Sequence, residues 1–478
     1  MSEGAGKMWS GRFREPLDRT FEQWQRSFPF DVRLLPQEVA ASKAHARMIA
    51  AAGILTPEEL ARMQAGLDGV LAGATSGNAE LVASAPNAED IHHFVELQLT
   101  KGIGDLALKL HTGRSRNEQI ATDMRLFVRE AIDGTADGLQ AWAGELVQLA
   151  HSAGQEVMPS YTHLQRAEPV LVAHWLLAYV SMIERDISRL ADLAARLNYC
   201  PLGSGAIAGA TLALDRTIAS RELGFTAPTA NSMDATSDRD FLVEFLQALS
   251  TIALHTSRFA EEITLFATAE FGFITLPESF STGSSAMPQK MNPDLTELVR
   301  GRTGRIQGAV TAATMQLKGL PLAYNKDLQE MQLPLFESTE GLLPIMELLS
   351  PFTHKLSFRL QIMEHAAEIG FLNAMAAATY LSHRGVPFRR AHHIIGEAVR
   401  LSLDKGCELD GLTLEELRQF SPAFAEDFYS NITLAATVDC HDVIGGTARA
   451  RVREALTRAK ARLNSEVTPP MEVAGAHS

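Results

Sequence analysis

Cysteine is scarce in this sequence, and its placement excludes two kinds of site. Only three cysteines occur, Cys200, Cys407 and Cys440, and they are widely spaced with no CxxC pair. This scattered, odd set fits a reducing compartment and argues against a disulfide framework or a thiolate metal site. HExxH, P-loop and Cys/His metal spacings are also absent, and the adjacent histidines at 92–93 and 392–393 would point in different directions on a helix. We therefore expect neither a metal nor a cofactor.

Long apolar runs are missing as well. The first residues, MSEGAGKMWSGRF, hold no apolar core of the kind found in a secretory signal. The longest apolar run, Pro169–Ile183, is broken by His174 and is too short to span a bilayer. The sequence therefore predicts a cytoplasmic protein with no membrane partner.

The charge balance is acidic, with a net charge of −14 and a pI of about 5.6. This balance argues against nucleic acid as a main partner. Hydrophobic residues make up 46% of the chain and charged residues 21%, which is ordinary for a folded protein. A chain of 478 residues exceeds one compact core of the usual size, so we expect two or three structural regions.

Sustained helical periodicity is the strongest feature that the sequence does contain. Apolar residues recur in steps of three and four over 128–149, 176–197 and 242–266. Such stripes indicate long helices that bury their seams against one another, and no alternating strand pattern is as strong. The sequence therefore predicts an all-α protein with a central bundle of long helices. Bundles of this length often complete a multi-helix core as a closed symmetric oligomer.

Shorter segments flank this bundle. We predict an N-terminal mostly helical domain over residues 1–113, the central bundle domain over 114–363 and a small C-terminal helical domain over 364–478. The last residues, 465–478, are polar and contain two prolines in a row, which predicts a frayed tail.

Local signals mark helix starts and loops in the N-terminal region. Thr56-Pro57-Glu58-Glu59 combines a cap, a proline and acids in the order of a helix start, and residues 88–93 predict another. Residues 1–35 and 73–87 lack a helical period, and we expect them to be irregular.

One polar stretch, Phe280–Asp294 (FSTGSSAMPQKMNPD), interrupts the helical pattern. Pro288 and Pro293 forbid a continuous helix, and Gly283 orders at little steric cost. The stretch is either an ordinary surface connection or a loop that closes over a substrate. Its functional groups are two hydroxyls, two amides and one cation: Ser284, Ser285, Gln289, Asn292 and Lys290.

Three more polar clusters interrupt the helices, and each has a structural alternative. Residues 110–119 (LHTGRSRNEQ) could bind a carboxylate through their arginines, or they could simply form a capped helix start whose arginines are solvated. Residues 160–169 (SYTHLQRAEP) place a histidine before a long helix, for proton transfer or a structural hydrogen bond. Residues 321–330 (PLAYNKDLQE) gather a phenol, amides and a cation, or form a polar helix start. The small-residue run 201–210 lacks the strand of a dinucleotide fingerprint and predicts a tight turn or close helix packing.

Taken together, these clusters resemble the fumarase/aspartase superfamily and, within it, the argininosuccinate lyase family. GSSAMPQKMNP is similar to the superfamily signature GSSxMPxKxN. The argininosuccinate branch is matched by HTGRSRNEQ, YTHLQRAEP, PLGSGAIAG, NSMDATSDRDF, LKGLPLAYNKDLQE and the early EVAASKAHARMIAAAGILTPEEL. The resemblance covers nearly the whole chain.

The resemblance implies a carbon–nitrogen lyase that splits argininosuccinate reversibly into L-arginine and fumarate, in arginine biosynthesis. A proton must leave the carbon beside a succinyl carboxylate, giving an aci-carboxylate, before the carbon–nitrogen bond breaks. Such a site needs a base, a cation at the charged carboxylate and donors for the second carboxylate. The family also implies a homotetramer whose active sites take residues from three subunits.

Carried over position by position, the resemblance implies four catalytic residues. Ser284 matches the serine taken as the base, and Lys290 matches the lysine that faces the aci-carboxylate. His163 matches the acid, or the holder of a water that is the acid, and Glu297 matches its carboxylate partner. Either Ser284 or His163 removes the proton; we favour Ser284, provided that loop N–H groups and cations hold its oxyanion. The matching substrate-binding residues are Ser27, Asp31, Ser115, Arg116, Asn117, Thr162, Asn292, Tyr324 and Gln329.

Two positions depart from the family pattern. Gln332 stands where the family commonly has a lysine that contacts substrate, and Met291 stands where a second lysine is frequent. Losing one charge-assisted contact costs about 1.5–3 kcal/mol, so these changes bear on substrate affinity or preference more than on the chemistry. The alternatives are a lyase acting on another N-substituted succinate and, as in the delta-crystallins, a structural relative without activity.

Overall fold

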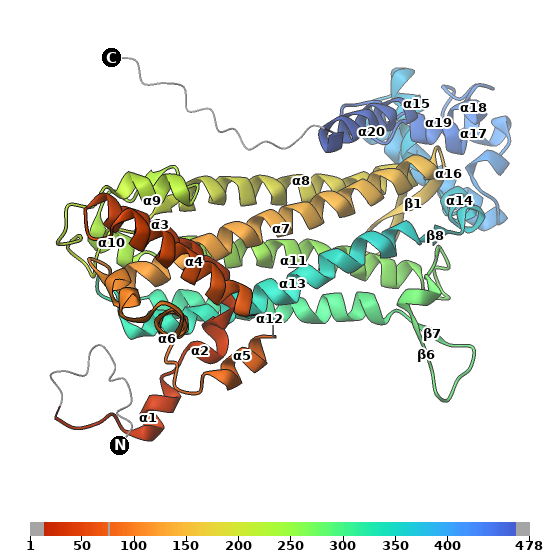
Figure 1. Cartoon of the computed structure of the whole chain (residues 1–478). Helices are drawn as coiled ribbons and strands as arrows, with labels where there is room; N and C mark the ends of the chain where they lie inside the picture. Colours follow the sequence, from red (N-terminus) through yellow and green to blue (C-terminus); the bar gives the residue numbers. More distant parts are fainter. Residues whose placement is uncertain (1–13, 75–76, 465–478) are drawn as a thin grey trace, which may run out of the picture. The chain divides into compact units, whose positions relative to one another are not determined.

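The computed structural model describes residues 14–74 and 77–464, and most of this chain is helical (Figure 1). The strands within these residues are short and form two-stranded pairs: β1 with β2, β3 with β4, β5 with β8, and β6 with β7. The all-α prediction is therefore confirmed. The expected tail at 465–478 lies outside the described residues.

Five long helices form the framework. They are α7 (Arg116–Ala153), α8 (Val172–Leu197), α11 (Asp240–Phe266), α12 (Asp294–Leu317) and α13 (Gln332–His354). The first three contain the predicted apolar stripes, so the periodicity correctly located long helices. Buried residues such as Leu139, Leu176 and Phe245 lie on these stripes.

The chain divides into two compact units whose boundaries fall within the long helices. Unit 1 comprises Met1–Ile132, Asp192–Leu246 and Ala309–Glu337. Unit 2 comprises Asp133–Ala191, Gln247–Gly308 and Ser338–Ser478. The three-domain division by sequence ranges stays a prediction.

Besides its parts of the long helices, unit 1 contains many short elements. They are α1 (Arg19–Trp24), α2 (Phe28–Asp31), η2 (Val32–Leu34), α3 (Leu35–Ala51), α4 (Pro57–Gly73), α5 (Asn78–Ser84), α6 (Ile91–Ile103), η3 (Gly104–His111), β3 (Tyr199–Cys200), α9 (Arg216–Glu222), β4 (Ala227–Pro228), α10 (Ser232–Ser237) and η5 (Lys326–Met331). One buried apolar cluster joins α3, α7 and α9 through residues such as Met48, Leu126 and Leu223. This packing holds the starts of α3 and α7 in place.

Unit 2 contains the remaining short elements. They are β1 (Val157–Thr162), β2 (Gln165–Leu171), β5 (Ile274–Thr275), η4 (Glu278–Phe280), β6 (Thr282–Gly283), β7 (Met291–Asn292), β8 (Ser357–Phe358), α14 (Leu360–Glu368), α15 (Ala374–His383), α16 (Phe388–Lys405), η6 (Leu409–Gly411), α17 (Leu414–Phe420), α18 (Phe428–Asn431), α19 (Leu434–Asp439) and α20 (Arg449–Asn464). Its C-terminal part has an apolar core of its own, which includes Leu381, Phe424 and Phe428.

Two predicted helix starts are confirmed by their caps. The Thr56 side chain accepts from the N–H of Glu59, and Glu59 accepts from the N–H of Thr56, which closes a capping box on α4. At α6 the Asp90 carboxylate accepts from the N–H of His93 at 2.7 Å. These caps set the direction in which α4 and α6 leave their loops.

The structure corrects three local expectations. Residues 14–35 hold the short helices α1 and α2, and residues 77–87 hold α5, although both stretches were expected to be irregular. Residues 160–169 form the tip of the β1–β2 hairpin, with His163 and Leu164 at φ of 54° and 57°. Such turns usually carry asparagine or glycine, so the pair His163-Leu164 gave no hairpin signal.

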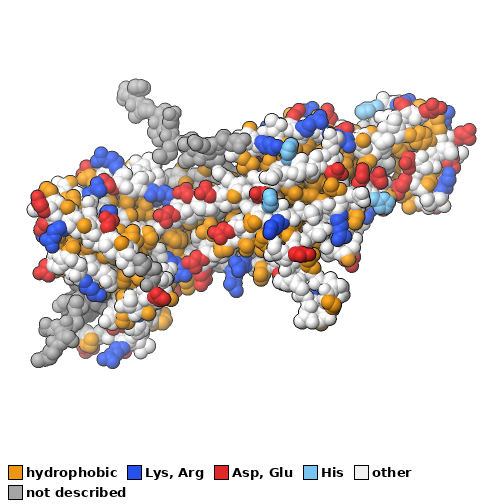
Figure 2. All heavy atoms as spheres, turned by 45° about the vertical axis from the view of Figure 1, so that its right-hand side comes forward, with side chains coloured by type: hydrophobic (Ala, Val, Ile, Leu, Met, Phe, Trp, Pro, Cys, Tyr) orange, Lys and Arg blue, Asp and Glu red, His pale blue; other side chains and the backbone are white. Residues whose placement is uncertain are grey.

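None of the described helices is long and apolar enough to cross a membrane. In Figure 2 acidic, basic and apolar side chains are interspersed over the visible face. That face therefore carries no extended field of one sign.

Candidate active site

A pocket of about 190 Å³ in unit 1 gathers polar side chains from segments far apart in the sequence. Its lining is Ser27, Asp31, Glu89, Asp90, His92, Arg116, Asn117, Ile120, Tyr324, Lys326, Gln329 and Gln332. The lining includes these predicted substrate-binding residues: Ser27, Asp31, Arg116, Asn117, Tyr324 and Gln329. Both signs of charge occur in the lining, so the pocket suits a ligand that is itself zwitterionic.

The start of α7 positions one wall of this pocket. The N–H of Asn117 donates to Ser115 Oγ at 3.3 Å, and the N–H of Ser115 donates to the Glu118 carboxylate at 3.0 Å. These two hydrogen bonds cap the first turn of α7, in line with the capped helix start that the sequence offered as an alternative. Arg116 Nη1 then lies 3.0 Å from the Asp90 carboxylate, and Asn117 Nδ2 donates to a backbone carbonyl at 3.0 Å.

Acidic groups form a second wall. Asp31 is 1% exposed, and its Oδ1 has no hydrogen-bond partner among the described residues. Burial, followed by the charge of Asp90, raises the pKa of Asp31 to about 7. Glu89 lies 3.9 Å from Arg116 Nη1, so the arginine is held between two carboxylates.

The segment before α13 supplies a third wall. Gln329 Nε2 donates to the carbonyl of Gln25 at 3.1 Å. Burial raises the pKa of Tyr324, against the opposing influence of the buried Arg239. Gln332 is 4% exposed, and its Oε1 has no partner in the described chain. The neutral amide at this departure from the family pattern therefore faces the ligand space.

Sequence analysis missed four charged lining residues. Glu89 and Asp90 were interpreted only as a helix start, His92 also as part of a histidine pair unsuited to a metal, and Lys326 as the cation of the polar cluster at 321–330. The run Glu-Asp-Ile-His has the composition of a polar site, but the direction in which its side chains point depends on how α6 packs. That packing is a property of the tertiary structure, so the residues alone did not reveal it.

Ser284 lies in unit 2, on the loop that joins β6 and β7. Its Oγ accepts hydrogen bonds from the N–H groups of Ala286 at 3.3 Å and Met287 at 3.1 Å. Two backbone donors aimed at one hydroxyl oxygen would stabilise its oxyanion. The loop contains no helix between β6 and β7, as Pro288 and the other breakers predicted.

The other predicted groups of this loop differ in their contacts. Asn292 Nδ2 donates to Thr282 Oγ1 at 3.4 Å and to the Gly283 carbonyl at 3.3 Å, which closes the base of the hairpin. Lys290 is exposed and its ammonium makes no hydrogen bond or ion pair with a described residue. Glu297 is also exposed and lies 3.9 Å from Arg300, one turn along α12.

His163 and Thr162 lie at the tip of the β1–β2 hairpin, also in unit 2, and both are exposed. Within the described chain, His163 forms no hydrogen bond or ion pair, and its predicted pairing with Glu297 is not among the contacts of this chain. The structure thus gathers the predicted binding residues of unit 1 in one pocket, except Ser115, which caps α7 beside it. It shows no hydrogen bond or ion pair between the described residues of the hairpin tip and those of the β6–β7 loop.

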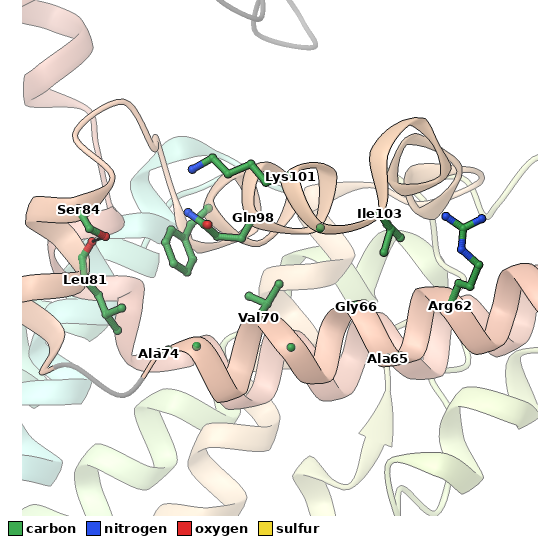
Figure 3. A pocket seen from close by; sticks show the side chains of 14 residues that line it. Arg62, Ala65, Gly66, Val70, Ala74, Leu81, Ser84, Gln98, Lys101 and Ile103 are labelled. Carbon is green, nitrogen blue, oxygen red and sulfur yellow. Dashed lines mark hydrogen bonds between the residues drawn. The ribbon is translucent and has the colours of Figure 1, made fainter.

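A larger pocket, of about 750 Å³, lies between α4 and α6 (Figure 3). Its lining is mostly small and apolar, with glycine at three α4 positions: Gly66, Gly69 and Gly73. Arg62 and Lys101 supply its charges, and none of the predicted site residues lines it. Figure 3 shows Val70 pointing toward α6. This space lacks the converging acids and bases that a catalytic site needs.

Comparisons with known proteins identify the family of the chain. The lyase family matches residues 11–308, and the argininosuccinate lyase C-terminal family matches residues 371–439. The argininosuccinate lyase of Acidobacterium capsulatum is 66% identical over 453 residues, which is 94% of this chain and 93% of that protein. That of Koribacter versatilis is 54% identical, over 96% of this chain and 97% of that protein.

Solved structures agree on the fold. An EDDS lyase variant with bound fumarate superposes with a TM-score of 0.80 at 25% identity, over 91% of this chain and 87% of that one. A 3-carboxy-cis,cis-muconate lactonizing enzyme from Pseudomonas putida has a TM-score of 0.72 at 21% identity, over 90% of this chain and 94% of that one. Since the lyase family matches more than half of the chain and its relatives match nearly all of it, the chain belongs to the argininosuccinate lyase family of carbon–nitrogen lyases.

Proposed function

We propose that the protein catalyses the reversible β-elimination of argininosuccinate to L-arginine and fumarate, as a step of arginine biosynthesis in the cytoplasm. The observation that carries this proposal is the pocket of unit 1, in which Arg116 pairs with Asp90 and Glu89 and the buried Asp31 lines the same space. Argininosuccinate bears carboxylates at one end and an ammonium group at the other, so a pocket of mixed charge complements it. The proposal includes no cofactor and no metal.

Ser284 is the proposed base. It takes the proton from the succinyl carbon beside a carboxylate, and the electron pair moves into that carboxylate to give the aci form. The two N–H groups that donate to Ser284 Oγ support this role, because they would stabilise the oxyanion. Lys290, the exposed cation of the same loop, would then neutralise the aci-carboxylate.

His163 and Glu297 complete the proposed reaction. The electron pair returns to form the fumarate double bond, the carbon–nitrogen bond breaks, and the leaving guanidine nitrogen takes a proton from His163 or from a water that it holds. Glu297 would orient the imidazole. Ser115, Thr162 and Asn292 are the remaining substrate-binding positions that the resemblance implies.

We infer that the working form is a homotetramer whose active sites take residues from three subunits. The lack of contacts between His163 and Glu297 within one chain supports this inference, because neighbouring chains would supply them. The long helices of the bundle also favour an oligomer, since sustained seams need partners.

The experiment is a substrate panel. Purified protein is given argininosuccinate, adenylosuccinate, aspartate or malate, and fumarate is followed by its ultraviolet absorbance. We expect fumarate only from argininosuccinate, with an equal amount of arginine. Fumarate from another compound, or from none, would contradict the proposal.

Gln332 favours one second candidate, a lyase of the same chemistry acting on another N-substituted succinate. Its neutral, buried amide lines the pocket where the family commonly has a lysine. Such an enzyme would release fumarate from that compound faster than from argininosuccinate. A protein that is only structural would release fumarate from neither.

A further inference from the structure

Three buried ionisable side chains meet beside the pocket of unit 1. Glu38 on α3 is 1% exposed, His92 on α6 is 7% exposed and Asp123 on α7 is 0% exposed. His92 Nδ1 lies 2.7 Å from Glu38 Oε2 and 3.8 Å from Asp123 Oδ2. Buried charges are costly unless they are paired, so the protonation of this cluster decides how it behaves.

Glu38 is the charged acid of the cluster. Its oxygens accept from Ser42 Oγ at 2.7 Å and from Gln119 Nε2 at 3.1 and 3.3 Å, in addition to His92. Burial alone would raise the pKa of Glu38, but His92, the nearby Arg114 and Ser42 together lower it to about 2. Glu38 is therefore a carboxylate at neutral pH.

Asp123 has the opposite environment. Both of its carboxyl oxygens are buried and lack a donor among the described residues. Burial, followed by the charge of Glu38, raises the pKa of Asp123 well above its ordinary range, and Asp31 adds to this while Arg114 opposes it. A buried carboxyl group beside a carboxylate, with no donor to its own oxygens, favours the neutral form, which has one hydroxyl to donate.

His92 connects the cluster to the ligand space. Its Nδ1 is engaged by Glu38, so Nε2 is the ring nitrogen left for the pocket that His92 lines. Burial alone would lower the pKa of His92, but Glu38 and Asp90 raise it, against an opposing effect of Arg116. The two acidic neighbours favour the imidazolium, in which both ring nitrogens are donors.

Two more histidines lie near the cluster, and burial, followed by the charge of Arg114, lowers the pKa of His45 on α3 to about 3. Burial and Arg114 lower the pKa of His111, on η3, to about 4. His111 is therefore neutral and adds no charge near pH 7.

We propose that Asp123 is a positioning residue: it keeps its proton and donates it in a hydrogen bond to Glu38, which fixes the Glu38–His92 pair so that His92 presents Nε2–H to a carboxylate of the ligand. One side-chain nitrogen or oxygen of each of the three residues lies within 4.8 Å of the others, so Asp123 is a direct neighbour of Glu38. This proposal rests on the proposed function in one respect, because it takes the ligand to be a succinate derivative.

A divalent cation is the competing occupant, because Glu38, His92 and Asp123 also have the composition of a metal site. The hydrogen bonds that Glu38 already accepts favour a protonated Asp123 over a bound cation. Ser42, Gln119 and His92 occupy its oxygens, so a cation would have to displace them.

Three substitutions separate these possibilities. Asp123→Asn keeps the size of the side chain, and its amide can donate the hydrogen bond assigned to the protonated carboxyl. Asp123→Leu removes the donor, and Glu38→Gln removes the negative charge beside His92. For each variant the kcat and KM of fumarate release are measured, and nitrogen NMR of isotope-labelled histidine distinguishes the imidazolium from the neutral ring.

We expect Asp123→Asn to keep KM within about twofold and to keep His92 charged. Asp123→Leu and Glu38→Gln should raise KM by about tenfold or more, with a smaller change in kcat, and Glu38→Gln should leave His92 neutral at pH 7. If Asp123→Asn instead behaves like Glu38→Gln, the ionised carboxylate is required and the proposal is wrong.

Two further measurements do not depend on activity, and the first of them uses the unmodified protein. In the infrared spectrum, the band of a protonated carboxyl group that shifts on isotope labelling of aspartate should persist at about pH 8.5. At this pH, which is above the pKa of Asp31, Asp31 has lost its proton. Absence of this band overturns the proposal. So does stoichiometric binding of Mg²⁺ or Zn²⁺ that Asp123→Asn abolishes. An inactive wild-type protein would refute the proposed function and leave these two results to decide about Asp123.

Discussion

The pocket of unit 1 and the loops of unit 2 differ in how completely the chain itself satisfies their polar groups. In the pocket, Arg116 lies 3.0 Å from Asp90, and His92 lies 2.7 Å from Glu38. On the loops, the side chains of Lys290 and His163 are exposed and make no hydrogen bond or ion pair with a described residue. The fold of one chain therefore preorganises the groups proposed to bind substrate, whereas those proposed to move protons still need partners.

The largest effect is expected when the Ser284 hydroxyl, which two backbone N–H groups of its own loop contact, is removed. Ser284→Ala should lower kcat by about 10³-fold or more and change KM little, because the hydroxyl acts in proton transfer and not in binding. Steady-state fumarate release measures both constants. Gln289→Ala, an exposed change in the same loop, is the matched control and should stay near wild type. Near-full turnover by Ser284→Ala would make another group the base.

The burial of Asp31 in the pocket is tested by how the stability of the Asp31→Asn variant depends on pH. The pKa of Asp31 rises from 3.8 to about 7 on burial, so the folded protein holds this proton more tightly than the unfolded chain. The cost of burying the group is therefore absent at low pH and grows as the pH rises to 7, to as much as about 4 kcal/mol.

Thermal or denaturant unfolding from pH 4 to 7 should show a steeper loss of stability for wild type than for Asp31→Asn. Asp105→Asn, at an exposed position of the same unit, should keep the wild-type slope. Parallel curves for wild type and Asp31→Asn would mean that Asp31 keeps its ordinary pKa in the fold.

A smaller effect is expected for Arg116→Gln. The change removes the cation between Asp90 and Glu89, so a substrate carboxylate loses a charge-assisted contact of about 1.5–3 kcal/mol. KM should rise about tenfold to a hundredfold, with kcat changed less. Arg62→Gln, beside the larger pocket between α4 and α6, should leave both constants unchanged. A loss confined to kcat would assign Arg116 to the chemistry instead.

The smallest effect is expected for Gln332→Lys, which restores the lysine common in the family. Gln332 lines the pocket with an unpartnered Oε1, and nearby carboxylates could pair with the new ammonium. KM for argininosuccinate should fall by up to about tenfold, as measured in the same fumarate assay. A higher KM would show that the pocket is built around the neutral amide.

The parts of the fold that the sequence could predict depend on local patterns. Apolar stripes located α7, α8 and α11, and the capping signals at Thr56 and Ser115 located helix starts. The β1–β2 hairpin could not be predicted, since its turn residues His163 and Leu164 adopt a positive φ that asparagine and glycine adopt far more often.

The candidate site also has a part that the sequence could predict and a part that it could not. The resemblance identified residues that line the pocket, such as Asp31 and Tyr324, because they lie within motifs. It did not identify the buried cluster of Glu38, His92 and Asp123, which lie on three separate helices. Their meeting depends on how α3, α6 and α7 pack, and neither spacing nor composition encodes that directly.

The most direct test of the contrast between pocket and loops is subunit complementation. Inactive His163→Asn and Ser284→Ala proteins are mixed, subunit exchange is verified with differently tagged chains, and fumarate release from argininosuccinate is measured. If the two groups of one active site come from different chains, some mixed sites contain both native residues, and activity should rise far above that of either parent. No gain in activity after complete exchange would contradict this account and place both groups in one chain.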